Sequence, residues 1–109
     1  MSFEVRTLPN FEREAKRLNK KQRSLKKDLQ TLIESLEKSP QQGEPLGNDF
    51  YKVRLAISSK SSGKSGGARI ITCVKIIKNI VFLSSIYDKS EKASITNREL
   101  KLLAKQIKL

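Results

Sequence analysis

A chain of 109 residues with 37% hydrophobic side chains is long enough for one core, so a single domain spanning residues 1–109 is expected. Its 23 lysines and arginines outnumber 11 acidic residues and give a formal net charge of +12, which favours RNA, DNA or an acidic protein as partner. With no histidine and one cysteine, the usual Cys/His zinc site and an intramolecular disulfide are excluded, and no run of residues resembles a signal peptide or a membrane span. A cytoplasmic protein is therefore expected.

The N-terminal part of the chain predicts one strand and two helices. Residues 3–8 alternate apolar and polar side chains, which is typical of a short strand. Helical spacing of apolar residues begins after Asn10, a candidate N-cap. A second helix follows a candidate cap at Asn19 and ends near Pro40. The two helices are expected to form a hairpin.

The middle of the chain predicts three strands. Residues 50–57 alternate in polarity, and this alternation places Lys52 and Arg54 on the same face. Residues 68–77 and 79–87 are apolar at nearly every position, as in strands that are covered on both faces. Lys78 and Asn79 mark a tight turn before the third of these strands.

The C-terminal segment predicts a last helix. Thr96 and Glu99 have the spacing of a capping box, and apolar residues at helical spacing follow them. The predicted order is β-α-α-β-β-β-α, an α+β fold.

The stretch KSSGKSGGAR at residues 60–69 contains GKS, which is found in phosphate-binding loops. Such a loop needs an earlier glycine, where this chain has Ser58, and it leads into a helix, where this chain has a strand. A linker between domains is also disfavoured, because neither flank is long enough to fold alone. The stretch is therefore interpreted as a long, flexible hairpin loop with Lys60 and Lys64 at its tip. It is either a simple connection whose lysines aid solubility or a basic flap over a nucleic-acid groove.

Basic side chains gather in the strand region without acidic neighbours. No Asp or Glu occurs between Phe50 and Tyr87, a segment that contains Lys52, Arg54, Lys60, Lys64, Arg69, Lys75 and Lys78. Antiparallel pairing would bring Arg69 close to the Lys52–Arg54 face, and the next strand ends with Tyr87 and Lys89. A site without paired carboxylates or histidine is neither a glycosidase site nor a His-based triad. Guanidinium groups suit a phosphodiester, because they bind phosphate oxygens bidentately.

RNA carries its own nucleophile, the 2′-hydroxyl, so its cleavage needs a base, an acid and anion stabilisers but no metal ion. A lysine among other cations can act as the base, which makes Lys52 the candidate, helped by Lys89. Arg54 and Arg69 would stabilise the phosphate, and Tyr87 would stack on a base or donate a proton. The same residues, with Lys75, would equally serve to hold backbone phosphates without cleaving them.

Four segments in this order, FYKVRLA, the Gly/Ser/Lys loop, GGARII and VFLSSIYDKSE, resemble the RelE/ParE toxin superfamily, and most closely RelE/HigB-type toxins of type II toxin–antitoxin systems. The resemblance implies a microbial-RNase-like α+β fold with an antiparallel-rich sheet, an N-terminal helical hairpin and a C-terminal helix. It implies a ribosome-dependent mRNA endonuclease without cofactor. It also implies a cognate antitoxin that covers the basic groove and through which the complex binds operator DNA. Arg69 matches the arginine that binds the scissile phosphate, which favours the flap interpretation for Lys60 and Lys64.

The sequence departs from this family at two points. The catalytic tyrosine of the C-terminal segment falls at Ile95, so Tyr87 is the substitute, and the histidine of HigB-type enzymes is absent. These departures leave two alternatives open: a ParE-like toxin that inhibits DNA gyrase without cleaving RNA, and a non-enzymatic nucleic-acid-binding module.

Overall fold

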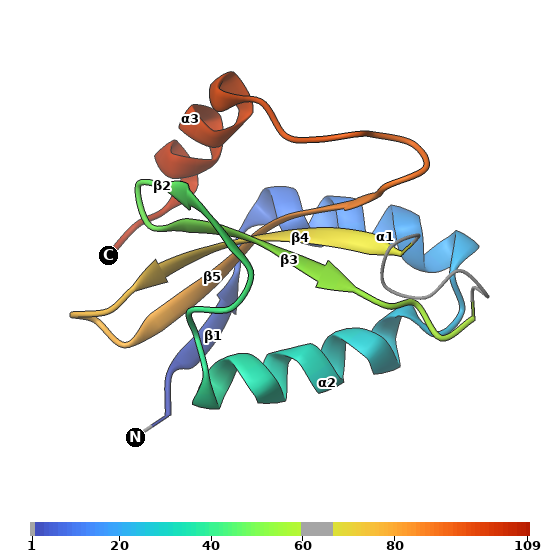
Figure 1. The fold of residues 1–109 in the computed structure, drawn as a ribbon, viewed down its shortest axis with the longest axis horizontal. Helices are drawn as coiled ribbons and strands as arrows, with labels where there is room; N and C mark the ends of the chain where they lie inside the picture. The colour runs from blue at the N-terminus through green and yellow to red at the C-terminus, as the bar shows by residue number, and fades with distance from the viewer. Residues whose placement is uncertain (1, 60–66) are drawn as a thin grey trace.

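A computed structural model describes residues 2–59 and 67–109, and within them the chain forms a five-stranded sheet between helices (Figure 1). The strands are β1 (Glu4–Thr7), β2 (Glu44–Gly47), β3 (Phe50–Leu55), β4 (Ala68–Lys75) and β5 (Ile80–Asp88), and the helices are α1 (Pro9–Lys21), α2 (Leu25–Lys38) and α3 (Asn97–Gln106). The strand order is β1-β5-β4-β3-β2, with β1 parallel to β5 and the other pairs antiparallel. The predicted α+β fold is confirmed, and none of the described helices is long and apolar enough to cross a membrane.

The structure adds one strand to the predicted order. Residues 41–49 read as turns because they contain Pro45 and two glycines, yet β2 forms there and pairs with β3 at the edge of the sheet. An edge strand tolerates proline, because one row of its backbone N–H groups has no ladder partner. Asn48 and Asp49 both have positive φ values, 52° and 70°, as a two-residue hairpin turn requires.

The ends of the helices differ from the predicted ones at two places. Asn10 is not the cap of α1, because the helix starts at Pro9 with Leu8 at the N-cap position, two residues earlier than predicted. The Asn10 side-chain amide donates to the Ser84 carbonyl of β5 instead. Asn19 does not start a second helix, since α1 continues past it and α2 begins at Leu25. Basic side chains in the last turn of α1 complement the helix dipole and favour this extension.

The predicted capping box of α3 is confirmed. The Thr96 hydroxyl accepts a hydrogen bond from the Glu99 backbone N–H at 3.1 Å, and the Glu99 carboxylate accepts one from the Thr96 N–H at 2.9 Å. Two backbone donors at the start of the helix are thus satisfied by local side chains.

The turn between β4 and β5 is longer than predicted. β4 ends at Lys75, and Ile76 to Asn79 form the turn, with Asn79 at a φ of 57°. Ile77 therefore lies 94% exposed at the tip instead of inside a strand.

Each face of the sheet has its own apolar core. One face packs against α1 and α2 through Phe11, Leu18, Leu25, Leu32, Leu36, Val53, Leu55, Ile57, Ala68, Ile70, Val74, Val81, Leu83 and Ile86. The other packs against α3 through Leu8, Phe50, Ile71, Cys73, Ile80, Phe82, Tyr87 and Leu103, and Figure 1 shows α2 and α3 on opposite sides of the sheet. We call these the two-helix face and the α3 face.

Candidate nucleic-acid interface

Three of the candidate side chains form one row across the sheet. Arg54 of β3 pairs with Arg69 of β4, and Arg69 pairs with Tyr87 of β5. All three belong to the α3 face, and side chains directly opposite one another in antiparallel strands have Cβ atoms roughly 5 Å apart. The expected approach of Arg69 to the Lys52–Arg54 face is thus observed, and Tyr87 extends it.

Lys52 lies two residues before Arg54 on β3 and on the same face. It is opposite Ile71 on one side and Glu44 of β2 on the other, and its ammonium is 3.4 Å from the Glu44 carboxylate. A depression of about 490 Å³ beside β3 is lined by Gln42, Gly43, Glu44, Lys52, Val53 and Arg54. Sequence reasoning missed Glu44, because its segment was not recognised as a strand.

The row is exposed at one end and buried at the other. Arg54 is exposed, whereas Arg69 is 3% exposed and Tyr87 is 7% exposed. The Arg69 guanidinium donates to the Ala68 carbonyl at 3.2 Å. Among the described residues, the buried Tyr87 hydroxyl has no hydrogen-bond partner.

Burial controls the protonation of Tyr87. It raises the pKa of the phenol above the usual value, while the Arg69 charge acts in the opposite direction. The phenol is therefore held in its neutral form beside a guanidinium.

Two lysines flank the Tyr87 end of the row. Lys89 is exposed just after β5, and its backbone N–H donates to the Gly67 carbonyl at 3.2 Å, which ties this turn to the residue before β4. Lys92 lies with its ammonium 5.2 Å from the centre of the Tyr87 ring and forms an ion pair with Glu99. No spacing signal marked Lys92, because it comes close to Tyr87 only through the path of the chain into α3.

Lys75, a predicted RNA-binding residue, lies at the opposite end of β4 from the row. Six residues of extended strand separate it from Arg69, roughly 20 Å. Its ammonium is 3.0 Å from the Asp49 carboxylate, and this hydrogen bond raises the Lys75 pKa. Lys60 and Lys64 fall outside the described residues.

The hairpin interpretation of the Gly/Ser/Lys stretch is consistent with the strands on either side of it. β3 and β4 pair antiparallel up to Leu55 and Ala68, so the stretch connects hairpin strands and leads into a strand. Gly67 passes close to β3: a Cβ at this position would lie 2.1 Å from the Leu55 carbonyl oxygen. The described part of the chain has no group of three or more His, Cys, Asp or Glu side chains placed to hold a metal ion.

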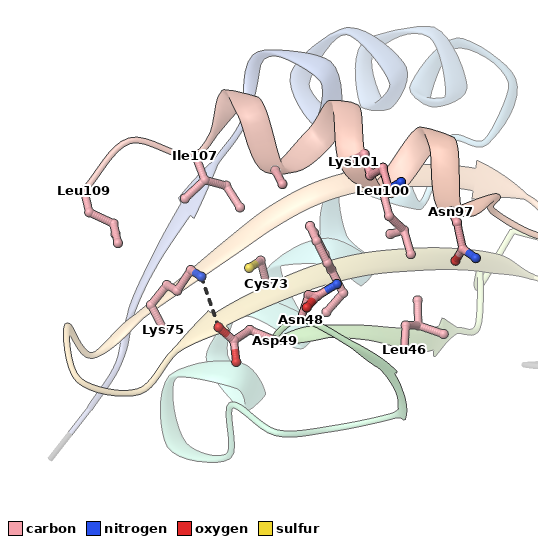
Figure 2. Close-up of a pocket in the computed structure, with 12 residues that line it drawn as sticks. Leu46, Asn48, Asp49, Cys73, Lys75, Asn97, Leu100, Lys101, Ile107 and Leu109 are labelled. Carbon is pink, nitrogen blue, oxygen red and sulfur yellow. Dashed lines mark hydrogen bonds and ion pairs between the residues drawn. The ribbon is translucent and has the colours of Figure 1, made fainter.

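A groove of about 640 Å³ lies between α3 and the sheet (Figure 2). Lys75 and Asp49 face each other at its mouth, and Cys73 lies at its floor. Burial raises the pKa of the Cys73 thiol to about 11, so the thiol is protonated at neutral pH. The groove lacks the arginines of the row, and we do not assign phosphate chemistry to it.

Comparison with known proteins identifies the family. The family model described as the RelE toxin of the RelE/RelB toxin–antitoxin system matches residues 10–108. A search of curated proteins found no match.

Solved structures share the fold. A double arginine-to-alanine mutant of E. coli toxin RelE in the free state is 22% identical, with a TM-score of 0.65, and the match covers 99% of this chain and 100% of that one. A chain of the intact E. coli RelBE toxin–antitoxin complex is 21% identical, with a TM-score of 0.60, and the match covers 80% of this chain and 96% of that one. Isolated E. coli RelE is 17% identical, with a TM-score of 0.61 and coverage of 97% and 100%. Because the family model spans nearly the whole sequence, the chain belongs to the RelE toxin family of RelE/RelB toxin–antitoxin systems.

Proposed function

We propose that this protein is a toxin that cleaves mRNA on the ribosome through metal-free attack by the RNA 2′-hydroxyl. The observation that carries this proposal is the row of Arg54, Arg69 and Tyr87 across three neighbouring strands. Two guanidinium groups and one neutral phenol in a row suit a phosphodiester, since they offer anion stabilisation and a proton donor together.

Each residue of the site has a role in the proposed reaction. The 2′-oxygen attacks phosphorus and the bond to the 5′-oxygen breaks, which leaves a cyclic phosphate and a 5′-hydroxyl. Arg69 stabilises the charge that develops on the phosphate, and Arg54, which is exposed, engages the RNA backbone from solvent. Tyr87 donates the proton that the departing 5′-oxygen takes up.

Lys52 is the candidate base for the 2′-hydroxyl proton, with Lys89 assisting. Glu44, at 3.4 Å from the Lys52 ammonium, is a second candidate for the same proton, because a carboxylate is a common general base. Lys92, beside the Tyr87 ring, adds a cation on the leaving-group side.

The burial of Arg69 and Tyr87 supports a requirement for a large partner. RNA alone meets Arg54 first, and contact with the rest of the row needs a movement of the surrounding residues. The ribosome supplies both the mRNA and the binding energy for that movement.

A cognate antitoxin of the RelB kind is the second proposed partner. The E. coli relative is known in an intact RelBE complex. A net charge of +12 favours an acidic antitoxin segment over the basic surface, and the complex would bind operator DNA through the antitoxin.

Primer extension on translating mRNA tests the proposal. Expression of the wild-type protein should produce cuts within coding sequence and arrest growth. Arg69→Lys should reduce cleavage by on the order of 100-fold, because lysine keeps the charge but loses the bidentate contact.

Arg6→Lys is the matched control. Arg6 lies on β1, is exposed and pairs with Glu4 at 2.6 Å, so this variant should cleave like wild type. Melting temperatures of both variants show whether the buried Arg69 site still folds. Growth arrest with intact mRNA would rule the proposal out.

A ParE-like inhibitor of DNA gyrase is the alternative, and one observation favours it. Ile95, where the family carries its catalytic tyrosine, is packed with the apolar core under α3. Inhibition of gyrase in a supercoiling assay without mRNA cuts would select this alternative, and RNA binding without toxicity would select a non-enzymatic binding module.

A further inference from the structure

β5 contains one residue more than the segment of β4 with which it pairs. Leu83 lies opposite Thr72, but the next partner of β4, Ile71, lies opposite Ser85. Ser84 is therefore the extra residue of a β-bulge, an irregularity that changes the alternation of side chains along a strand.

The bulge decides which face Tyr87 occupies. Before it, even-numbered Phe82 belongs to the α3 face and odd-numbered Leu83 to the two-helix face. After it, odd-numbered Tyr87 belongs to the α3 face. With an uninterrupted register from Leu83, Ile86 would lie opposite Arg69 and Tyr87 would point into the two-helix core.

Glu14 of α1 holds this bulge. Its Oε1 atom accepts hydrogen bonds from the Ser85 hydroxyl at 2.8 Å, the Ile86 backbone N–H at 3.1 Å and the Asn10 side-chain amide at 2.9 Å. The same Asn10 amide donates to the Ser84 carbonyl at 3.1 Å. Ser84 and Ser85 are buried, so the polar groups of the bulge need hydrogen-bond partners within the protein. Asn10 and Glu14, one turn apart on α1, supply these partners.

We propose that Glu14 is a positioning residue of the RNA-cleaving site, which acts by stabilising the Ser84 bulge that turns Tyr87 toward Arg69. The hydrogen bonds of Glu14 to β5 go to Ser85 and Ile86, so its effect on Tyr87 passes through the backbone of β5. The inference rests on the proposed function for the catalytic role of Tyr87, but the control of the Tyr87 position stands without it.

Tyrosine NMR tests the position of Tyr87 independently of activity. The chain has two tyrosines, and Tyr51 on β3 serves as an internal reference in protein with ¹³C-labelled tyrosine rings. Glu14→Ala should shift the Tyr87 ring resonances and weaken the ring's contacts with the apolar core of the α3 face, with Tyr51 unchanged. Glu12→Ala, a change at an exposed acid on the same helix, should leave both tyrosines unchanged.

Two further variants keep this test decisive. Glu14→Gln retains an oxygen that accepts hydrogen bonds, so its Tyr87 resonances should stay close to those of wild type. Ser85→Ala removes one hydrogen-bond donor to Glu14 and should shift the Tyr87 resonances less than Glu14→Ala does. If Glu14→Ala does not fold, Ser85→Ala takes its place in the test. Unchanged Tyr87 resonances in Glu14→Ala, or in Ser85→Ala if that variant replaces it, would overturn the inference.

Cleavage kinetics on ribosome-bound mRNA separate positioning from general destabilisation. Glu14→Ala should lower kcat about tenfold or more with KM little changed, because a small displacement of a reacting group costs rate. In a Tyr87→Phe background the same substitution should have less than about a twofold effect. An equal loss in both backgrounds would overturn the positioning role. If wild type does not cleave mRNA while Tyr87 still moves in Glu14→Ala, the proposed function fails and the bulge inference stands.

Discussion

Tyr87 illustrates how one residue takes its chemistry from its surroundings. Burial is the main cause of its raised pKa, and the nearby Glu99 and Glu44 carboxylates add to it against the opposing Arg69. The phenol therefore stays mostly protonated even at a pH equal to the ordinary tyrosine pKa of about 10. In the proposed reaction it serves as a proton donor and not as a base.

Asp28 shows the opposite shift, on the two-helix side of the sheet. Its carboxylate accepts hydrogen bonds from the Ser58 hydroxyl at 2.6 Å, the Ser58 backbone N–H at 2.9 Å and the Ser24 hydroxyl at 2.8 Å. Burial alone would raise the Asp28 pKa, but these hydrogen bonds, with the Lys27 charge, lower it. Asp28 thereby ties the start of α2 to the residues that follow β3.

Asp28→Asn should lower the free energy of unfolding at pH 7 by about 1–3 kcal/mol, because hydrogen bonds to a charged acceptor are lost. Since the folded-state pKa lies below the unfolded value, the carboxylate stabilises the fold above about pH 4 and loses this effect as the pH falls through the folded-state pKa. Urea unfolding at pH 7 and at pH 3 measures both effects. Glu34→Gln, at an exposed position of α2, should have little effect at either pH, and an Asp28→Asn deficit that does not shrink in acid would contradict the assignment.

The β2–β3 hairpin places Lys52 through a close contact between backbones. Gly43 and Gly47 both have left-handed φ values, 90° and 91°. A Cβ at position 43 would lie 2.2 Å from the Lys52 carbonyl oxygen, whereas one at position 47 would have no neighbour within 4 Å. The two glycines share a backbone requirement and differ only in the space around them.

Gly47→Ala should cost about 1–2 kcal/mol of stability, the strain of a left-handed alanine. Gly43→Ala should cost that amount plus about 1–3 kcal/mol, because the β3 backbone must move away from the new methyl group. Denaturant unfolding of the two variants compares these costs. The Gly43 variant should also lose cleavage activity through the displaced Lys52, and equal stability of the two variants would show that the close contact is not maintained.

At the scale of the whole molecule, the candidate site carries four partly or fully exposed cations of a chain with 23 lysines and arginines. The described cations at the site are Lys52, Arg54, Lys89 and Lys92, beside the buried Arg69. Such a surface should bind single-stranded RNA through its phosphates, with release of counterions.

The affinity for a short single-stranded RNA should therefore fall steeply with salt. Contacts from about four cations give a slope of log K against log salt near −3, roughly a 50-fold loss between 50 and 200 mM. Arg54→Ala should reduce the magnitude of the slope by about 0.7 in fluorescence-anisotropy titrations. Lys38→Ala, at the exposed end of α2, should not change it, and a slope near zero for wild type would show that phosphate contacts do not drive binding.

Local patterns in the sequence determined most of the secondary structure of this protein and the face on which two of its candidate residues lie. Alternation along β3 placed Lys52 and Arg54 on one face, the Thr96–Glu99 spacing marked the start of α3, and apolar runs located β4 and β5. These features depend on residues only a few positions apart, which is why the sequence alone predicted them.

Only the tertiary structure decided the finer geometry of the site. β2 forms because its partner β3 is beside it, and Lys92 meets Tyr87 because the chain turns back into α3. The Tyr87 face depends on a bulge in β5 that Glu14 holds from 71 positions away in the sequence. Contacts between distant segments leave no periodic signal, so the position of the tyrosine was determined by the folded chain and not by its neighbours in the sequence.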